Sequence, residues 1–214
     1  MKKLRILALA AVAMIAICAQ AGEKGYFGVR AAFNATTSTK LTQISGWGPG
    51  ASVGGIYHYN ISKPVYAQFG LSFDYNTIKI DGENDNKYNR QKYDGHLDII
   101  GLRLPIDIGF NLYQNSKVCL SAYTGPELFF NFSVKRNYDV TYNSSTTHES
   151  GKLTGSGMDI AWMLGVGVDI MHNWHVHVEG AYGLSDLGET DAMAIGKKSH
   201  FKRAEISVGL GYNF

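Results

Sequence analysis

The chain has 214 residues, enough for one domain with a buried interior and too few to require two. Charged residues make up 18%, below the usual quarter, while 25 glycines, 13 tyrosines and 10 phenylalanines are typical of a β-rich protein with little surface in water. The formal net charge is only +2, so the composition gives no reason to expect nucleic acid as a partner.

The first 21 residues have the pattern of a secretory signal peptide. A basic start at Lys2, Lys3 and Arg5 is followed by an apolar run over residues 6–17 and an A-x-A cleavage site at residues 19–21. The run is shorter than the roughly 20 residues that a membrane-spanning helix needs. We therefore predict a signal peptide at 1–21 and a mature domain at 22–214. Without those three basic residues the mature chain has 17 basic and 18 acidic residues, a net charge of −1.

The chain has two cysteines, and only one of them belongs to the mature domain. Cys18 raises the alternative of a lipoprotein, but Ile17 stands before it where a small residue is expected. Cys119 is then left alone, so an exported protein of this sequence has no internal disulfide.

Eight segments of the mature chain alternate between apolar and polar residues, the two-residue period of a β-strand with one apolar face. They span residues 27–34, 50–61, 65–75, 96–112, 118–134, 159–170, 174–184 and 203–214. Long polar segments, predicted as loops at 76–93, 135–157 and 185–201, alternate with short turns. Long loops outside the cell and short periplasmic turns are typical of outer-membrane barrels. We predict an all-β fold, an eight-stranded antiparallel up-and-down transmembrane β-barrel.

The last strand, 203–214, alternates most strictly and has the aromatic residues Tyr212 and Phe214 on its apolar face. An aromatic residue there suits an anchor at the membrane interface. We expect this strand to close the barrel against residues 27–34. Outer-membrane lipid and the barrel-assembly machinery, which would recognise Phe214, are the expected partners.

Some residues interrupt the alternation. Leu97 and Ile99 have the wrong parity for their strand, which predicts a β-bulge near Ile100. Pro105 and Pro126 lack an N–H inside strands that should have no free edge, so a bulge or strand end is expected at each. Phe129 falls on the polar face.

The polar face of the strands carries both signs of charge. Its members are Arg30, Asp74, Arg103, Asp107, Glu127, Asp159, Asp169, Glu179, Arg203 and Glu205. An eight-stranded barrel is just wide enough to be filled by side chains, and buried charges must be paired. We therefore predict a salt-bridged lumen and no wide water-filled pore. Arg203 and Glu205 are expected beside Arg30 at the seam between the last and first strands.

Three potential metal ligands follow one another on one strand face, at His175, His177 and Glu179, and Asp169 should lie beside one of the histidines. Imidazole and carboxylate suit zinc or copper, but such groups also pair with one another in a lumen. Same-face neighbours lie about 7 Å apart along a strand, so we predict pairing and assign no metal site and no cofactor.

The candidates for catalysis are Ser185-Asp186 and His96-x-Asp98, near the predicted outer rim. Neither forms a nucleophile–base pair that the sequence places within reach. We assign no catalytic residue and predict that the protein is not an enzyme.

Four short stretches and the C-terminal pattern resemble the outer-membrane β-barrel domain family, whose members are often labelled porin-family proteins. They are residues 102–106 (LRLPI), 124–128 (TGPEL), 165–169 (GVGVD) and 179–182 (EGAY), with the ending Ser207-x-Gly209-x-x-Tyr212-x-Phe214. Each is weak alone, while their order and the ending together are more specific. The resemblance implies an eight-stranded barrel in the cell outer membrane and mostly no assigned biochemical activity.

Three functions are compatible with these patterns. The first is a structural or surface-interaction protein that binds an unidentified ligand through its extracellular loops. The second is a narrow pore for small solutes. The third is a soluble periplasmic barrel of the lipocalin kind, whose apolar face would point inward to an apolar ligand.

Overall fold

The computed structural model describes residues 25–39, 46–86, 89–142, 145–152, 157–171, 173–186, 188–191 and 198–214. The predicted signal peptide, 1–21, and Cys18 lie outside these residues. Within the described ranges no helix is long and apolar enough to cross a membrane.

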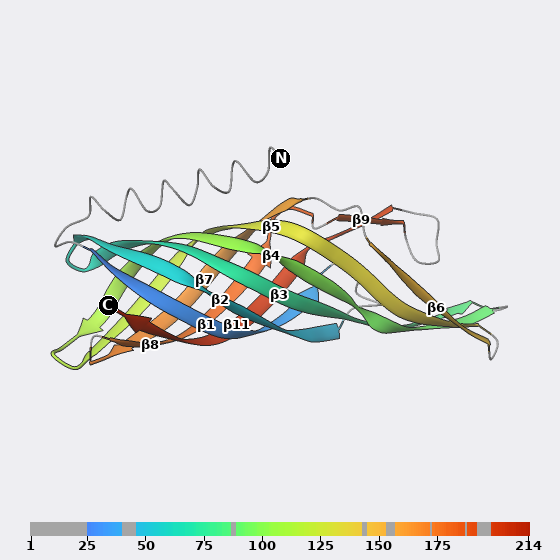
Figure 1. Ribbon diagram of the computed structural model, residues 1–214, viewed down its shortest axis with the longest axis horizontal. Helices are drawn as coiled ribbons and strands as arrows, with labels where there is room; N and C mark the ends of the chain where they lie inside the picture. Colours follow the sequence, from blue (N-terminus) through green and yellow to red (C-terminus); the bar gives the residue numbers. More distant parts are fainter. Residues whose placement is uncertain are drawn as a thin grey trace.

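Nine strands form one antiparallel sheet, and pairing of β4 with β5 closes eight of them into a ring (Figure 1). The ring consists of β1 (Gly25–Ser38), β2 (Gly46–Ser62), β3 (Val65–Asn86), β4 (Asn89–Gln114), β5 (Val118–Tyr142), β7 (Met158–Ile170), β8 (Trp174–Gly183) and β11 (Arg203–Asn213). The strand β6 (Ser145–Lys152) pairs with β5 outside the ring. A separate hairpin consists of β9 (Gly188–Asp191) and β10 (Lys198–Phe201). The predicted eight-stranded barrel is confirmed.

The first and last strands close the barrel, as predicted, in a continuous register from Gly28↔Asn213 to Ser38↔Arg203. The prediction that Arg203 and Glu205 lie beside Arg30 is wrong. Because the strands are antiparallel, Arg30, near the start of β1, lies opposite Gly211 near the end of β11. Arg203 begins β11 and therefore lies at the other end of the seam.

The apolar residues of the ring point outward. Phe33 is 82% exposed and Leu164 is 65% exposed, and large apolar side chains are exposed on every strand of the ring. Such a continuous apolar outer surface is what a bilayer core requires. The lipocalin alternative is wrong, because its apolar face would have to line the interior.

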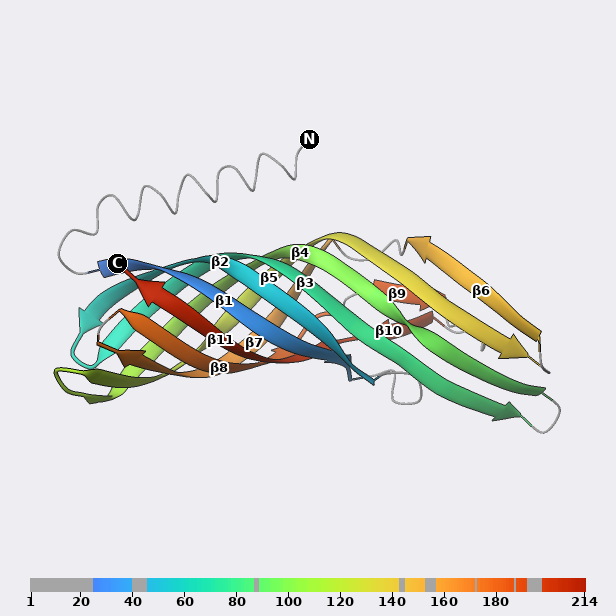
Figure 2. The ribbon, with the colours of Figure 1, turned by 60° about the horizontal axis from the view of Figure 1, so that its bottom comes forward.

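Three strands are much longer than the sequence predicted. β3 has 22 residues, β4 has 26 and β5 has 25, whereas about 9–11 suffice to cross a bilayer. With β6 they form a sheet that continues far beyond the rest of the barrel, at the end opposite the C-terminus (Figure 2). We call this sheet, residues 80–99 and 132–152, the extension. The predicted loops at 76–93 and 135–157 are therefore wrong over most of their length, and 185–201 contains β9 and β10.

An apolar cluster lies on the face of the extension that continues the inner wall of the barrel. Its members are Ile78, Ile80, Leu97, Ile99, Val134, Tyr138 and Val140. Ile78 and Leu97 are opposite each other and fully buried. Within the ring the same inner faces carry charges. The inner surface therefore changes from polar to apolar where the strands leave the ring.

The predicted irregularity near Ile100 is present, but it lies in β5. The register of β4 against β5 shifts between Ile100↔Ser133 and Gly101↔Asn131, leaving Phe132 without a partner on β4. β4 keeps its parity, so Leu97, Ile99 and Arg103 share one face. The bulge instead changes which alternate residues of β5 face inward, and so turns Val134 inward.

The bulges expected at the two prolines are absent from the described ladders. Pro126 pairs with Trp162 in an unshifted register between β5 and β7. Pro105 pairs with Glu127, and its ring lies over Gly70 of β3, where a Cβ would come within 2.7 Å of the proline Cγ. Glycine opposite the ring makes room for proline inside a continuous strand.

Candidate functional site

The part of the lumen nearest the extension is filled by an ion-pair network around Arg103 of β4. Its Nη2 donates to Oδ1 of Asp74 at 3.0 Å and also to Glu205, while Nη1 lies 3.8 Å from Oε1 of Glu127. Arg103 is 5% exposed and the three carboxylates are 1–3% exposed. Buried charges are tolerated when they are paired, so this side chain joins three strands across the barrel.

A second arginine completes the network from the closing strand. Nη2 of Arg203 donates to Asp159 at 3.1 Å, and Nη1 lies 3.7 Å from Asp74. The two guanidinium groups share the ring of Phe129, with Cζ of Arg203 at 3.3 Å and Cζ of Arg103 at 5.0 Å from its centroid. Phe129, which falls on the polar face of its strand, is thus a buried cation–π partner.

All ten charged residues predicted for the lumen lie on its inner face. They are three guanidinium groups and seven carboxylates, so the predicted salt bridges are confirmed but the two signs do not balance. Asp107 accepts from Gln68 at 3.4 Å, and Gln68 in turn accepts from Arg30 at 3.2 Å. Neutral side chains therefore supply part of the pairing.

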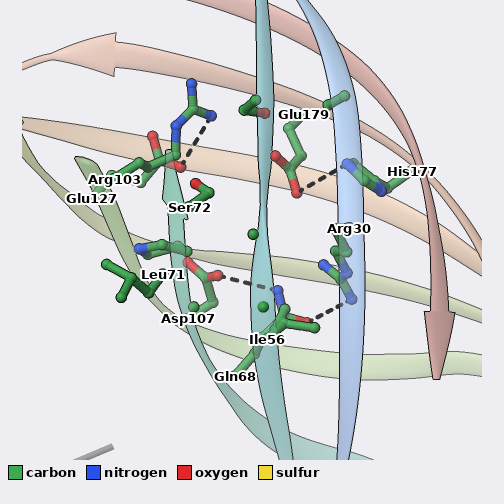
Figure 3. Close-up of a pocket in the computed structure, with 16 residues that line it drawn as sticks. Arg30, Ile56, Gln68, Leu71, Ser72, Arg103, Asp107, Glu127, His177 and Glu179 are labelled. Carbon is green, nitrogen blue, oxygen red and sulfur yellow. Dashed lines mark hydrogen bonds and ion pairs between the residues drawn. The ribbon is translucent and has the colours of Figure 1, made fainter. Parts of the chain in front are cut away.

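A cavity of about 50 Å³ lies in the middle of the lumen (Figure 3). Arg30, Arg103, Asp107, Glu127 and Glu179 line it together with His177 and smaller residues. About 10–15 Å³ of such volume accommodates one water molecule, so the cavity has room for only a few. It is not a solute-sized compartment.

The four candidate metal ligands form two separate pairs in the part of the lumen nearer the C-terminus. Nδ1 of His175 is 2.8 Å from Oδ1 of Asp169, as the turn geometry predicted, and Asn213 donates to the same oxygen at 3.0 Å. Glu179 accepts from Tyr123 at 2.7 Å and lies 4.0 Å from Nε2 of His177. No group of three or more His, Cys, Asp or Glu residues in the described chain could hold a metal ion.

Aromatic side chains fill the rest of this region. His58 stacks between Tyr26 and Tyr66, with ring centroids at 4.5 and 4.0 Å. The Tyr66 ring lies over Gly109, where a Cβ would approach Cζ to 2.1 Å. Glycine on the neighbouring strand gives the ring its space.

The residues considered for catalysis have structural partners. Oγ of Ser185 accepts from the backbone N–H of Ile160 at 2.7 Å, which fixes the start of β7. His96 lies 3.5 Å from Asp98, and Asp98 accepts from the hydroxyl of Tyr75 at 3.0 Å. Among the described residues these contacts include no serine or cysteine nucleophile beside a base.

The extension supplies a surface outside the barrel ring. Beyond the pair Gly46↔Lys79, β3 has no further pairing with β2, and β6 pairs only with β5 in the described chain. Residues 145–150 of β6 are exposed. The extension is therefore an open sheet with one apolar inner face, one polar outer face and two free edges.

The sequence matches the protein family described as the outer membrane protein beta-barrel domain over residues 7–214. The chain belongs to this family. Membership places the protein in the cell outer membrane, consistent with the apolar outer surface of the ring. No curated protein matches the sequence significantly.

Solved structures of other outer-membrane barrels are similar in fold. The Ail attachment invasion locus protein of Yersinia pestis is 12% identical, with 89% of this chain and 99% of that chain covered and a TM-score of 0.45. OprG of Pseudomonas aeruginosa is 14% identical, with coverages of 90% and 98% and a TM-score of 0.46. Neisserial surface protein A is 14% identical, with coverages of 88% and 97% and a TM-score of 0.40. Sequence identities and TM-scores this low carry no information on function.

Sequence reasoning identified the charged lumen of this family member but missed the extension. The missed signal is a change of composition on one face: β3 carries Asp74 and Asn76 and then Ile78 and Ile80 at the same parity. A polar face that becomes apolar without a change of period indicates a strand that leaves one environment for another.

Proposed function

We propose that this protein is a non-enzymatic outer-membrane barrel that presents the extension at the cell surface for interaction with molecules of other cells or of the surroundings. The observation that carries the proposal is the length of β3, β4 and β5, roughly twice what a bilayer needs. Ordering these residues costs conformational entropy, which the buried cluster around Ile78 and Leu97 offsets.

Removing the extension tests this proposal. One variant joins Lys79 to His96 through a two-residue turn and shortens β5 and β6 correspondingly, leaving the ring pairings intact. Cells carrying it should attach to surfaces or to one another less than cells carrying the full protein. Heat-modifiable gel migration serves as the folding control. Attachment at the full level by a correctly folded truncated barrel would contradict the proposal.

We further propose that the lumen is closed to solutes. The Arg103–Glu205 and Arg203–Asp159 contacts cross it, and the cavity below them measures about 50 Å³. Purified protein in planar bilayers should give no discrete conductance steps. Reproducible steps that disappear in a variant with the cavity filled would favour the alternative of a narrow solute pore.

The expected partners in assembly are outer-membrane lipid and the barrel-assembly machinery. Tyr212 and Phe214 support this part of the proposal. Their ring centroids are 5.3 Å apart, and together with Trp174 the two rings form an aromatic cluster on the outer surface. Export through the signal peptide at 1–21 belongs to the same proposal, and N-terminal sequencing of the membrane-inserted protein tests it.

A further inference from the structure

An open groove of about 430 Å³ lies on the outer surface where β2 begins beside β3 and β4. Its principal side chains are Trp47, Tyr75, Lys79, Asp94, His96 and Asp98. None of these takes part in the lumen network described above. The groove is within the size range of small-molecule sites, which combine aromatic walls with a few placed polar groups.

Two aromatic side chains of the groove remain accessible. Trp47 is 53% exposed and Tyr75 is 41% exposed. The register of β2 against β3 shifts between Trp47 and Gly50, so a bulge redirects the start of β2 at this groove. Bulges frequently re-aim a side chain next to a binding site.

The polar groups of the groove are oriented by one another. Asp98 accepts from the Tyr75 hydroxyl at 3.0 Å and lies 3.5 Å from Nε2 of His96. Lys79 lies directly opposite His96 across the strands, and its ammonium is 3.3 Å from Asp81. With Lys79 neutralised by Asp81, the carboxylates of Asp94 and Asp98 leave the groove without excess positive charge.

We propose that this groove binds an uncharged saccharide. The aromatic rings of Trp47 and Tyr75 supply faces for the C–H surface of a sugar ring, and Asp94, Asp98 and His96 supply acceptors and a donor for its hydroxyls. A polyanion would meet two carboxylates. A purely apolar ligand would desolvate them without a hydrogen bond in return.

The position of the groove is compatible with two sources of sugar. Phe73, two residues before Tyr75 on the same strand, is 48% exposed and belongs to the apolar outer surface. The groove therefore lies next to that surface, and with the extension at the cell surface, as proposed above, it faces the headgroup region of the outer leaflet. A glycolipid headgroup and a soluble glycan share the chemistry that would be recognised.

The inference rests on the proposed function, because it assigns a ligand class to the surface around the base of the extension. Purified full-length protein in nanodiscs should be applied to an array of neutral, amino and sulfated oligosaccharides. The variants are Trp47→Ala and Asp98→Asn. The matched control is Trp174→Ala, an exposed tryptophan at the other end of the barrel.

Wild type and the Trp174→Ala control should bind neutral oligosaccharides, and the two groove variants should bind at least about tenfold more weakly, as expected for loss of a central anchor. In a second arm, nanodiscs with and without a glycolipid bearing a neutral core oligosaccharide distinguish the sources. A rise in melting temperature that only the glycolipid produces, and only in protein with the intact groove, assigns the sugar to the protein's own membrane.

Equal binding by wild type and Trp47→Ala in both arms, or binding of sulfated glycans alone, would overturn the inference. That result leaves the attachment assay with the truncated extension untouched. Loss of attachment on truncation together with unchanged glycan binding in the groove variants would show that the surface role is correct and the assigned ligand wrong.

Discussion

The guanidinium carbon of Arg203 lies 3.3 Å from the centroid of the Phe129 ring, and that of Arg103 lies 5.0 Å from the same centroid. Two cations therefore share one aromatic ring in a lumen where each also binds carboxylates. The quadrupole of the ring attracts both cations. The closing strand is thereby joined to β4 through a residue of β5.

Substitution of Phe129 by alanine should destabilise the barrel by about 3–5 kcal/mol, the usual range when a buried phenylalanine is replaced by alanine. The loss of cation–π contact adds to the packing loss. The midpoint of urea unfolding in detergent micelles measures the effect. Phe110→Ala is the control, because Phe110 is half exposed on the outer surface. Equal midpoints for the two variants would show that Phe129 has no special role.

Separate removal of Arg203 and its partner should be strongly non-additive. Arg203→Gln leaves the buried carboxylates of Asp159 and Asp74 without this partner and should cost about 3 kcal/mol or more. Adding Asp159→Asn to that variant should recover at least about 1 kcal/mol relative to the sum of the single changes. Unfolding free energies of the four proteins give the coupling. Simple additivity would indicate that the pair at 3.1 Å does not interact energetically.

Glycines beneath large inner side chains should resist substitution. At Gly209 a Cβ would come within 2.5 Å of the His177 ring and 2.6 Å of the backbone oxygen of Ala31. Gly209→Ala should therefore destabilise the barrel by about 1–3 kcal/mol. At Gly180 the nearest such atom is 4.0 Å away, so Gly180→Ala serves as the control. Heat-modifiable migration of both variants across a temperature series makes the comparison.

Zinc should leave the thermal stability of the folded barrel unchanged. His175 already pairs with Asp169 at 2.8 Å, and His177 faces Glu179 at 4.0 Å, so the imidazoles have separate partners. The melting temperature is measured with and without zinc in wild type and in His177→Ala. A zinc-dependent rise in wild type that His177→Ala abolishes would establish a metal site and refute the pairing interpretation.

Deletion of Phe214 should reduce membrane insertion more than it affects the stability of the inserted fraction. Phe214 is 73% exposed, so its removal leaves the buried network intact. The amount of heat-modifiable protein in the outer-membrane fraction is the readout. Leu210→Ala, an exposed residue on the same strand, is the control. Insertion at the level of that control would remove the proposed role of Phe214 in assembly.

The ring strands, their faces and the closing seam follow from the sequence because each rests on a local period of two. Leu164 and Asp159 occupy opposite faces of one strand, and lipid outside and paired charges inside both preserve that alternation. The location of Asp169 beside His175 is equally local, since a short turn connects their strands. The lengths of β3 and β5 do not follow in this way, because the apolar residues of the extension lie on the inner face, which carries charges within the ring.

The sequence by itself determined the compartment, the barrel and the identity of the ten charges in the lumen, because alternation assigns each residue to a face whatever its partners are. Tertiary structure alone decided which charges meet. Antiparallel pairing placed Arg203 opposite Ser38 and far along the seam from Arg30. The bulge in β5 turned Val134 inward, and Phe129 came to contact two arginines from other strands. Contacts of that kind depend on register and on strands distant in the chain, which a period cannot encode.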